Sequence, residues 1–183
     1  MKLTDKKLTA LYTSILITKQ HEKPNIIFDV TLKDLNKLDN ISRGVETIGY
    51  DKKNIHIVWV LNDIEVAMAQ NLNPDRGRVV DVDILINTHK GVSSTMAQIV
   101  SMGDRLKKFM DGAIILAFNK AFVDTELTQS PRGGSYLKEA EYVYLKKPGK
   151  PPVKRSDLGK NILDKIATYA PPVQDWSWNK KEK

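Results

Sequence analysis

The chain has 183 residues, of which 41% are hydrophobic and 28% are charged, and its formal net charge is +7. This composition is ordinary for a soluble globular protein, and the length suits one domain with a sizeable core. The absence of cysteine excludes disulfides, thiolate catalysis and cysteine-ligated zinc, and it fits a reducing compartment. Since no apolar run is long enough to cross a bilayer, we expect a cytoplasmic protein without membrane contact.

The positive charge is concentrated at the two ends of the chain. Residues 146–183 hold ten Lys and Arg against four Asp and Glu, whereas residues 25–145 hold 14 against 16. We therefore divide the chain into an α/β domain, 1–145, and a basic linker, C-terminal helix and tail, 146–183. A basic tail either binds nucleic acid or serves as a solubilising end, and the composition leaves both interpretations open.

The first half of the chain alternates between helical and strand patterns. Apolar residues at helical spacing predict a helix over 4–20, and the apolar run 25–30, "NIIFDV", predicts a buried strand. Helical spacing returns over 32–48, with Thr31 as a candidate cap, before a second apolar strand over 54–62. Strand, helix and strand in this order predict a βαβ unit with parallel pairing.

The second half continues the alternation. It predicts a short helix over 63–71, a mostly helical segment over 80–110, a strand over 112–119, an edge strand over 140–147 and a last helix over 156–170. We expect the long helical segment to break near Gly91 and Ser156 to cap the last helix. The fold class predicted is α/β, with a parallel sheet of at least three strands flanked by helices.

Polar residues follow the predicted strands at the edge where open α/β sheets bind ligands. Asp29 comes at the end of "FDVT" and would either accept a hydroxyl proton or support the next helix N-terminus. Thr31 would bind substrate, cap that helix, or do both. Asn62 ends the second strand and is a candidate substrate-binding residue.

The loop "NPDRGRVV" carries Arg76 and Arg78 on either side of Gly77. Guanidinium groups suit phosphate oxygens, so the pair would stabilise charge during phosphoryl transfer; a solvated surface turn is the alternative. His89, in "NTHKG", would act on substrate as an acid or base, or would bind the last carbonyls of a helix. No spacing of residues indicates a metal site.

Residues 25–118 resemble the C-terminal half of zeta-toxin-like P-loop kinases. The resemblance rests on features in one order: the acidic-x-Thr motif Asp29–Thr31, the pair Gly49–Tyr50, the apolar strand Ile55–Leu61, and the arginine loop with Arg76 and Arg78. It implies phosphoryl transfer from ATP, with Mg²⁺, to a hydroxyl acceptor. Asp29 would then face the acceptor, and the two arginines would face phosphate.

The sequence departs from this family at two points. Asp29 stands where the family commonly has Glu. The family's fold also begins with a strand, a P-loop and a helix, and residues 1–24 cannot supply that unit because their pattern is helical and contains no glycine. Without that loop the phosphate cradle is missing, so the resemblance implies either a partner that carries the P-loop half or a piece of a split or truncated kinase. Two alternatives stay open: a non-catalytic protein-binding or structural module on the same scaffold, and a nucleic-acid binder that uses its basic C-terminal tail.

Overall fold

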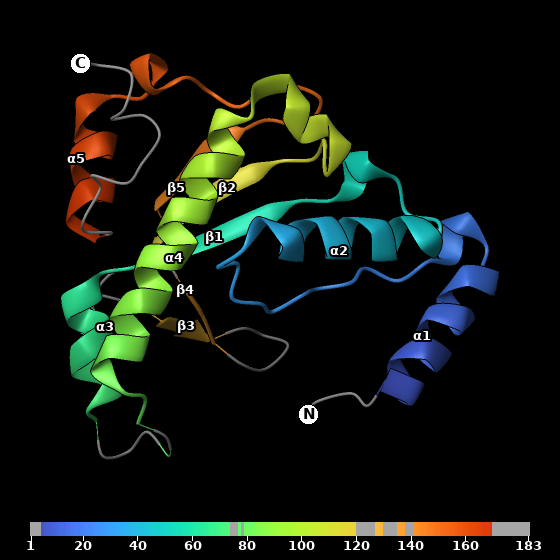
Figure 1. Cartoon of the computed structure of the whole chain (residues 1–183), viewed down its shortest axis with the longest axis horizontal. Helices are drawn as coiled ribbons and strands as arrows, with labels where there is room; N and C mark the ends of the chain where they lie inside the picture. The colour runs from blue at the N-terminus through green and yellow to red at the C-terminus, as the bar shows by residue number, and fades with distance from the viewer. Residues whose placement is uncertain are drawn as a thin grey trace.

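The chain folds as an α/β structure in which helices cross one face of a small sheet (Figure 1). This computed structural model describes residues 5–73, 77, 79–119, 127–129, 135–137 and 141–169. The helices are α1 Asp5–Ile17, α2 Leu35–Thr47, α3 Ile64–Asn71, α4 Val82–Ser101 and α5 Lys160–Tyr169, with short 3₁₀ segments η1 Gln20–Glu22, η2 Lys52–Asn54, η3 Gly103–Lys108 and η5 Arg155–Asp157. The strands are β1 Ile57–Asn62, β2 Ile114–Asn119, β3 Leu127–Gln129, β4 Ser135–Leu137 and β5 Glu141–Lys146.

The main sheet has three strands in the order β1-β2-β5. β1 and β2 are parallel and in register from the pair Ile57–Ile114 to the pair Asn62–Asn119. β5 is antiparallel to β2, with a register shift between Ile114 and Ile115. The sheet is therefore mixed: the parallel pair and the edge strand near 140–147 are confirmed, whereas a parallel sheet of three strands is not. β3 and β4 form a separate antiparallel pair.

The prediction of a strand over residues 25–30 is wrong. The segment has no strand assignment and belongs to neither sheet, although it contains the same kind of apolar run as β1. Its Ile27 side chain is 92% exposed, so the run does not form a buried strand. A strand exists only where another strand satisfies its backbone groups, and no other described strand pairs with this segment. The parallel connection in this fold runs instead from β1 through α3 and α4 to β2.

The core lies between the sheet and the helices that cross it. Alternate residues of β1, such as Trp59 and Leu61, point into it, as do Ile114 and Leu116 of β2. The same hydrophobic cluster includes residues of α2, α4 and α5: Leu38, Met96, Ile99 and Ile166. The other face of the sheet is open, because Val58 and Val60 of β1 are 58% and 56% exposed.

Helix α2 begins three residues later than the sequence pattern suggests. Its N-cap is Asp34, whose carboxylate accepts a hydrogen bond of 2.8 Å from the Asn36 amide, so Thr31 is not the cap. At the other end Gly49 adopts a φ of 85°, which closes the helix as the sequence predicts. Lys23 then joins two helix ends, since its ammonium donates to the carbonyl oxygens of Ile15 and Ile48.

Helix α4 is continuous through Gly91, so the predicted break is wrong. The glycine lies against a side chain from before α2: a Cβ at this position would lie 3.3 Å from Cε of Lys33. The same contact is reinforced by Thr95, whose hydroxyl donates to the Lys33 carbonyl oxygen over 2.8 Å. Ser93 does not cap a new helix and instead donates to the His89 carbonyl oxygen one turn earlier. The helix ends ten residues further on, at Ser101.

The last helix is also shorter than predicted. Ser156 lies within η5 and donates to the Asp157 carboxylate over 3.0 Å, whereas α5 begins at Lys160. The prediction that Ser156 caps α5 is therefore wrong. The chain before η5 is held to the sheet by a hydrogen bond of 2.9 Å from the Val153 amide to the Leu145 carbonyl oxygen. Over the residues that the structure describes, no helix is both long and apolar enough to span a membrane.

Candidate functional site

The carboxyl ends of β1 and β2 lie at one edge of the sheet. Asn62 and Asn119 are register partners there, and the Asn62 side chain is exposed. Asp63 follows Asn62 directly and accepts a hydrogen bond of 3.3 Å from the Val66 amide, so it caps α3. Edges of this type bind ligands in open α/β sheets, because the strand-to-helix connections leave polar groups beyond the strands.

Helices α3 and α4 project beyond this edge and carry the arginine loop between them. Arg76 and Arg78 lie outside the described residues, but the two ends of their loop are well defined. Asn71, which is fully buried, donates from Nδ2 to the Val80 carbonyl oxygen over 2.6 Å. Its Oδ1 accepts from the Val80 amide over 2.9 Å. Asn71 thus closes the base of the loop by pairing with both backbone groups of one residue.

The start of α4 is fixed by a helix cap. Asp81 caps α4 by accepting hydrogen bonds from the Asp83 and Ile84 amides, at 2.9 Å and 3.3 Å. Gly77 has no left-handed backbone conformation, and a Cβ there would meet no atom within 4 Å. We therefore find no structural requirement for glycine between the two arginines.

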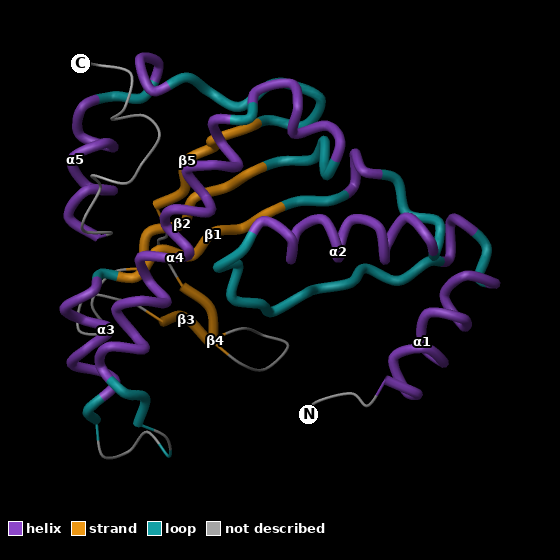
Figure 2. Tube along the Cα trace, in the orientation of Figure 1, coloured by secondary structure: helices purple, strands orange, loops and turns teal. Residues whose placement is uncertain are grey.

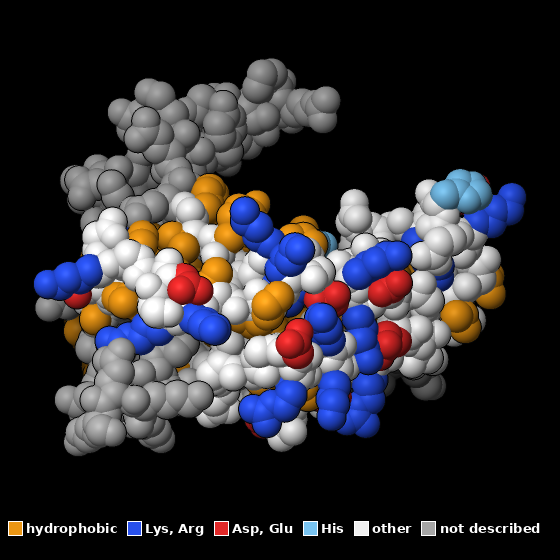
Figure 3. All heavy atoms as spheres, turned by 90° about the horizontal axis from the view of Figure 1, so that it is seen from above, with side chains coloured by type: hydrophobic (Ala, Val, Ile, Leu, Met, Phe, Trp, Pro, Cys, Tyr) orange, Lys and Arg blue, Asp and Glu red, His pale blue; other side chains and the backbone are white. Residues whose placement is uncertain are grey.

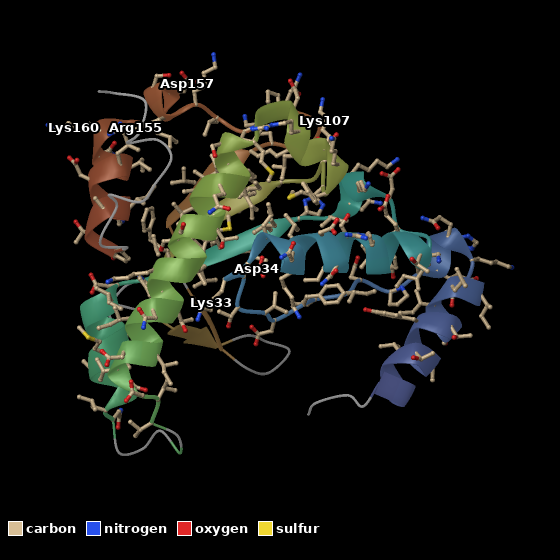
Figure 4. The ribbon with its side chains drawn as sticks, viewed as in Figure 1. Lys33, Asp34, Lys107, Arg155, Asp157 and Lys160 are labelled. Atoms are coloured by element: carbon tan, nitrogen blue, oxygen red, sulfur yellow. The ribbon has the colours of Figure 1, made fainter. Side chains whose placement is uncertain are left out.

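Asp29 and Thr31 lie in the extended segment before α2, and both side chains are exposed. They do not follow a strand, since residues 25–30 form none. The segment becomes anchored just after them, where the Lys33 carbonyl binds Thr95 and Asp34 caps α2. Figure 4 shows Lys33 and Asp34 at the start of α2, close in that view to the carboxyl end of β1. The Asp29 carboxylate is thus accessible to a ligand that approaches from solvent.

His89 lies in the middle of α4 and contacts the end of α5. Its Nε2 is 2.7 Å from the Tyr169 carbonyl oxygen, so the imidazole can donate a hydrogen bond to the last residue of that helix. The Tyr169 ring packs edge-on against Phe118 of β2, with 5.3 Å between the ring centroids. The sequence allows His89 two possible roles, and contact with helix-end carbonyls is one of them. Here the histidine is on α4 and the carbonyl belongs to α5. A role in substrate binding stays a prediction.

Mg²⁺ and ATP are implied by the resemblance, and the described residues can be tested for a fit to them. Across residues 5–73, 79–119 and 141–169, no group of three or more His, Asp or Glu side chains is arranged to hold a metal ion. Nor does the described carboxyl edge contain a glycine-rich loop that could cradle phosphates. This part of the chain therefore does not by itself form a nucleotide–magnesium site.

Two residues that sequence reasoning missed determine the geometry around the sheet. Asn71 gives no recognisable signal, because a polar residue at a helix end is ordinarily exposed. Lys146, at the end of β5, is 1% exposed, and its ammonium donates to the carbonyl oxygens of Asp111 and Gly112 and to the Asp111 carboxylate. The pairing of β2 with β5 shifts beside this lysine, since Ile114 pairs with Lys146 and Ile115 with Tyr144, and no sequence pattern predicts that shift.

Comparisons with known proteins find no relative of this chain. No protein-family model matches the chain, and neither a curated protein nor a solved structure matches it. The resemblance to zeta-toxin-like P-loop kinases therefore depends on the quoted motifs alone. The structure contributes three features to a functional interpretation: a carboxyl edge with polar residues, an accessible Asp29, and an edge strand β1 that pairs on one side only among the described residues.

Proposed function

We propose that this chain is one half of a zeta-toxin-like kinase, which transfers phosphate from ATP to a hydroxyl acceptor once a P-loop segment joins it. The P-loop would come from another polypeptide or from residues outside this sequence. Such a segment would supply the backbone amides and the lysine that bind the transferred phosphate. The chain described here would supply the acceptor side and the arginine loop.

One observation carries this proposal: the sheet is open on the β1 side. Over the described residues β1 pairs only with β2, so its other edge can pair with a strand from another chain. In Figure 2 the extended trace of residues 23–34 passes on this same side of the sheet. Its Ile27 and Val30 are 92% and 39% exposed. An added parallel strand would pair with β1 and bury apolar surface of this kind.

The roles of the individual side chains follow from their chemistry. Asp29 would accept the proton of the acceptor hydroxyl, and Thr31 would hold that acceptor by a hydrogen bond. Arg76 and Arg78 would neutralise charge on the transferred phosphate. Asn62 would bind substrate at the carboxyl edge. His89 would have to give up its contact with the Tyr169 carbonyl before it could act on substrate.

The test is reconstitution. The chain is tagged and co-expressed with the products of neighbouring genes, and the retained complex is assayed for ATP binding by calorimetry and for transfer of ³²P from ATP. We expect a P-loop protein to be retained, transfer to depend on it, and Arg76→Ala and Arg78→Ala each to reduce transfer at least about 100-fold. Lys90→Ala, an exposed α4 position, is the matched control. Absence of ATP and ADP binding in every complex would contradict the proposal.

A second candidate function is a protein-binding module that has the scaffold without catalysis. The exposed apolar side chain of Ile27 favours it, since such a residue suits a protein partner as well as an added strand. In this case a partner is retained, but the complex neither binds ATP nor transfers phosphate. Substituting Ile27 with Ser would release the partner under either function, so the phosphate-transfer assay is the measurement that separates them.

A further inference from the structure

At the opposite edge of the sheet, where β1 and β2 begin, Asp111 connects several segments of the chain by hydrogen bonds. The Asp111 amide donates to the Lys52 carbonyl oxygen over 2.9 Å, and the Asp111 carbonyl accepts from the Gly149 amide over 2.9 Å. The Asp111 carboxylate also binds the buried Lys146 ammonium at 3.0 Å. These bonds hold η2, the connection from η3 to β2, and the turn after β5 together at a single edge.

Segments η2 and η3 and the turn after β5 carry an excess of cationic side chains, which we call the basic edge: Lys52, Lys53, Arg105, Lys107, Lys108, Lys147 and Lys150. Three of them have acidic neighbours, because Lys52 binds Glu46, Lys53 binds Asp51 and Lys107 binds Asp104, at 3.2–3.4 Å. Figure 3 looks onto this end of the molecule, where blue side chains gather with red ones between them. Lys107 points outward from η3 in Figure 4.

Four members of the basic edge have no ion pair within the described part of the chain. They are Arg105, Lys108, Lys147 and Lys150, all of them exposed. An exposed cation without a carboxylate beside it keeps its full attraction for an external anion. The bonds around Asp111 fix the backbone under these side chains, so the charges are presented from a rigid edge.

The open face of the sheet adjoins this edge, and its outer strand β5 carries two exposed tyrosines. Tyr142 and Tyr144 of β5 are register partners of Ala117 and Ile115, and they are 57% and 51% exposed. Being two residues apart on one strand, they point to the same face with about 7 Å between their Cα atoms. Tyr144 is three residues from Lys147, about 10 Å along the chain, and Tyr142 is five residues from it, about 17 Å.

We propose that this surface binds single-stranded nucleic acid, with the phosphates on the basic edge and two successive bases on Tyr142 and Tyr144. Exposed aromatic rings on a sheet stack on unpaired bases, and cations beside them follow the phosphates. The bases of a duplex stack on one another, so only unpaired bases can stack on these rings. A membrane suits this surface less well, because side chains fixed on a flat sheet cannot insert between lipids as an amphipathic helix does.

This inference goes beyond the proposed kinase function and differs from binding by the C-terminal tail. The basic edge and the carboxyl edge with Asn62 lie at opposite ends of β1, so the two functions can fail separately. The tail also contributes lysines, Lys180, Lys181 and Lys183, which provide an internal comparison. If the sheet is the site, replacing these three with Ser should change affinity by less than about threefold at 150 mM salt.

The experiment is fluorescence anisotropy with a labelled 15-nucleotide oligo(U), an oligo(dT) of equal length and a 15-base-pair DNA duplex, from 50 to 300 mM salt. The edge variant replaces Arg105, Lys108, Lys147 and Lys150 with Ser. The matched control makes the same change of charge on other exposed positions: Lys19, Lys37, Lys90 and Lys160. Thermal melts by circular dichroism verify that each variant is folded.

We expect the single strands to bind at least about tenfold more tightly than the duplex at 150 mM salt. The edge variant should lower the slope of log K against log salt by about 2 to 3, whereas the control should leave it within about 1. Tyr142→Ala and Tyr144→Ala should each weaken binding about tenfold, and Tyr→Phe should retain it. Equal losses in edge variant and control, preference for the duplex, or binding to phosphatidylserine vesicles but to no oligonucleotide would each overturn the inference.

Discussion

Replacing Gly112 with alanine tests whether the connection into β2 has the close packing that the fold requires. A Cβ at this position would lie 2.1 Å from the Ile55 carbonyl oxygen and 2.8 Å from Nδ1 of His56. Ordinary van der Waals contacts of a Cβ begin at 3.4 Å. The nearest atom belongs to the backbone, and the His56 ring is held because its Nδ1 accepts a hydrogen bond from the Ala113 amide. Neither group can therefore rotate away.

The size of the effect follows from that overlap. The backbone before β1 must move by more than 1 Å relative to β2, where the two strands begin to pair. Overpacking in a well-packed core costs about 1–3 kcal/mol and occasionally more, and a rigid backbone neighbour puts Gly112→Ala at or above about 3 kcal/mol. For a chain of this size, we expect the melting temperature to fall by roughly 6–12 °C.

Two other glycines provide graded controls. Gly103 has a φ of 58°, and a Cβ there would meet no atom within 4 Å, so Gly103→Ala should cost about 1 kcal/mol through backbone conformation alone. Gly77 has neither constraint, and Gly77→Ala should change stability by less than about 0.5 kcal/mol. Urea unfolding and thermal melts measure all three. A melting temperature for Gly112→Ala within about 2 °C of the parent would refute the close contact.

Three other substitutions test the contacts that organise the fold. Lys146→Met removes a buried cation from its carboxylate and carbonyl partners and should lower the free energy of unfolding by about 3 kcal/mol in urea titrations, whereas the exposed Lys147→Met should have little effect. Asn71→Ala leaves two backbone groups of the arginine loop unpaired and should cost about 2–3 kcal/mol; the exposed Asn87→Ala is its control, measured in the same titration. Lys23→Met should release α1, seen as faster amide hydrogen exchange in residues 5–17 with little change in the sheet.

The sequence predicts the local elements of this fold well, because their signals lie within each segment. The apolar runs of β1 and β2 form strands of the main sheet, and the alternation over 140–147 marks the edge strand β5. Asp63 and Gly49 occupy the helix boundaries that capping chemistry assigns to them. In each case the residue acts on backbone groups within four positions, which makes the pattern readable without tertiary information.

The errors have a common cause, which is that distant residues decide the outcome. Residues 25–30 look like β1 in composition, but strand formation depends on a neighbour that the segment itself does not specify. Gly91 resembles a helix break, yet its missing side chain makes room for Lys33, which is far earlier in the chain. The candidate site has the same property, because Asn71 and Lys146 act through partners that only the folded chain brings to them.

The parallel pairing of β1 and β2 has a further consequence, since it separates two kinds of chemistry on one small sheet. Both strands begin at the basic edge around Asp111 and end five residues later at Asn62 and Asn119, about 17 Å away. At that distance, beyond two Debye lengths at physiological salt, charges at one end barely affect ligands at the other. Substitutions at the two ends should therefore have additive effects on stability and independent effects on binding. A polyanion held at the amino edge would leave the exposed Asn62 at the carboxyl edge accessible, so ligands at the two edges would not compete.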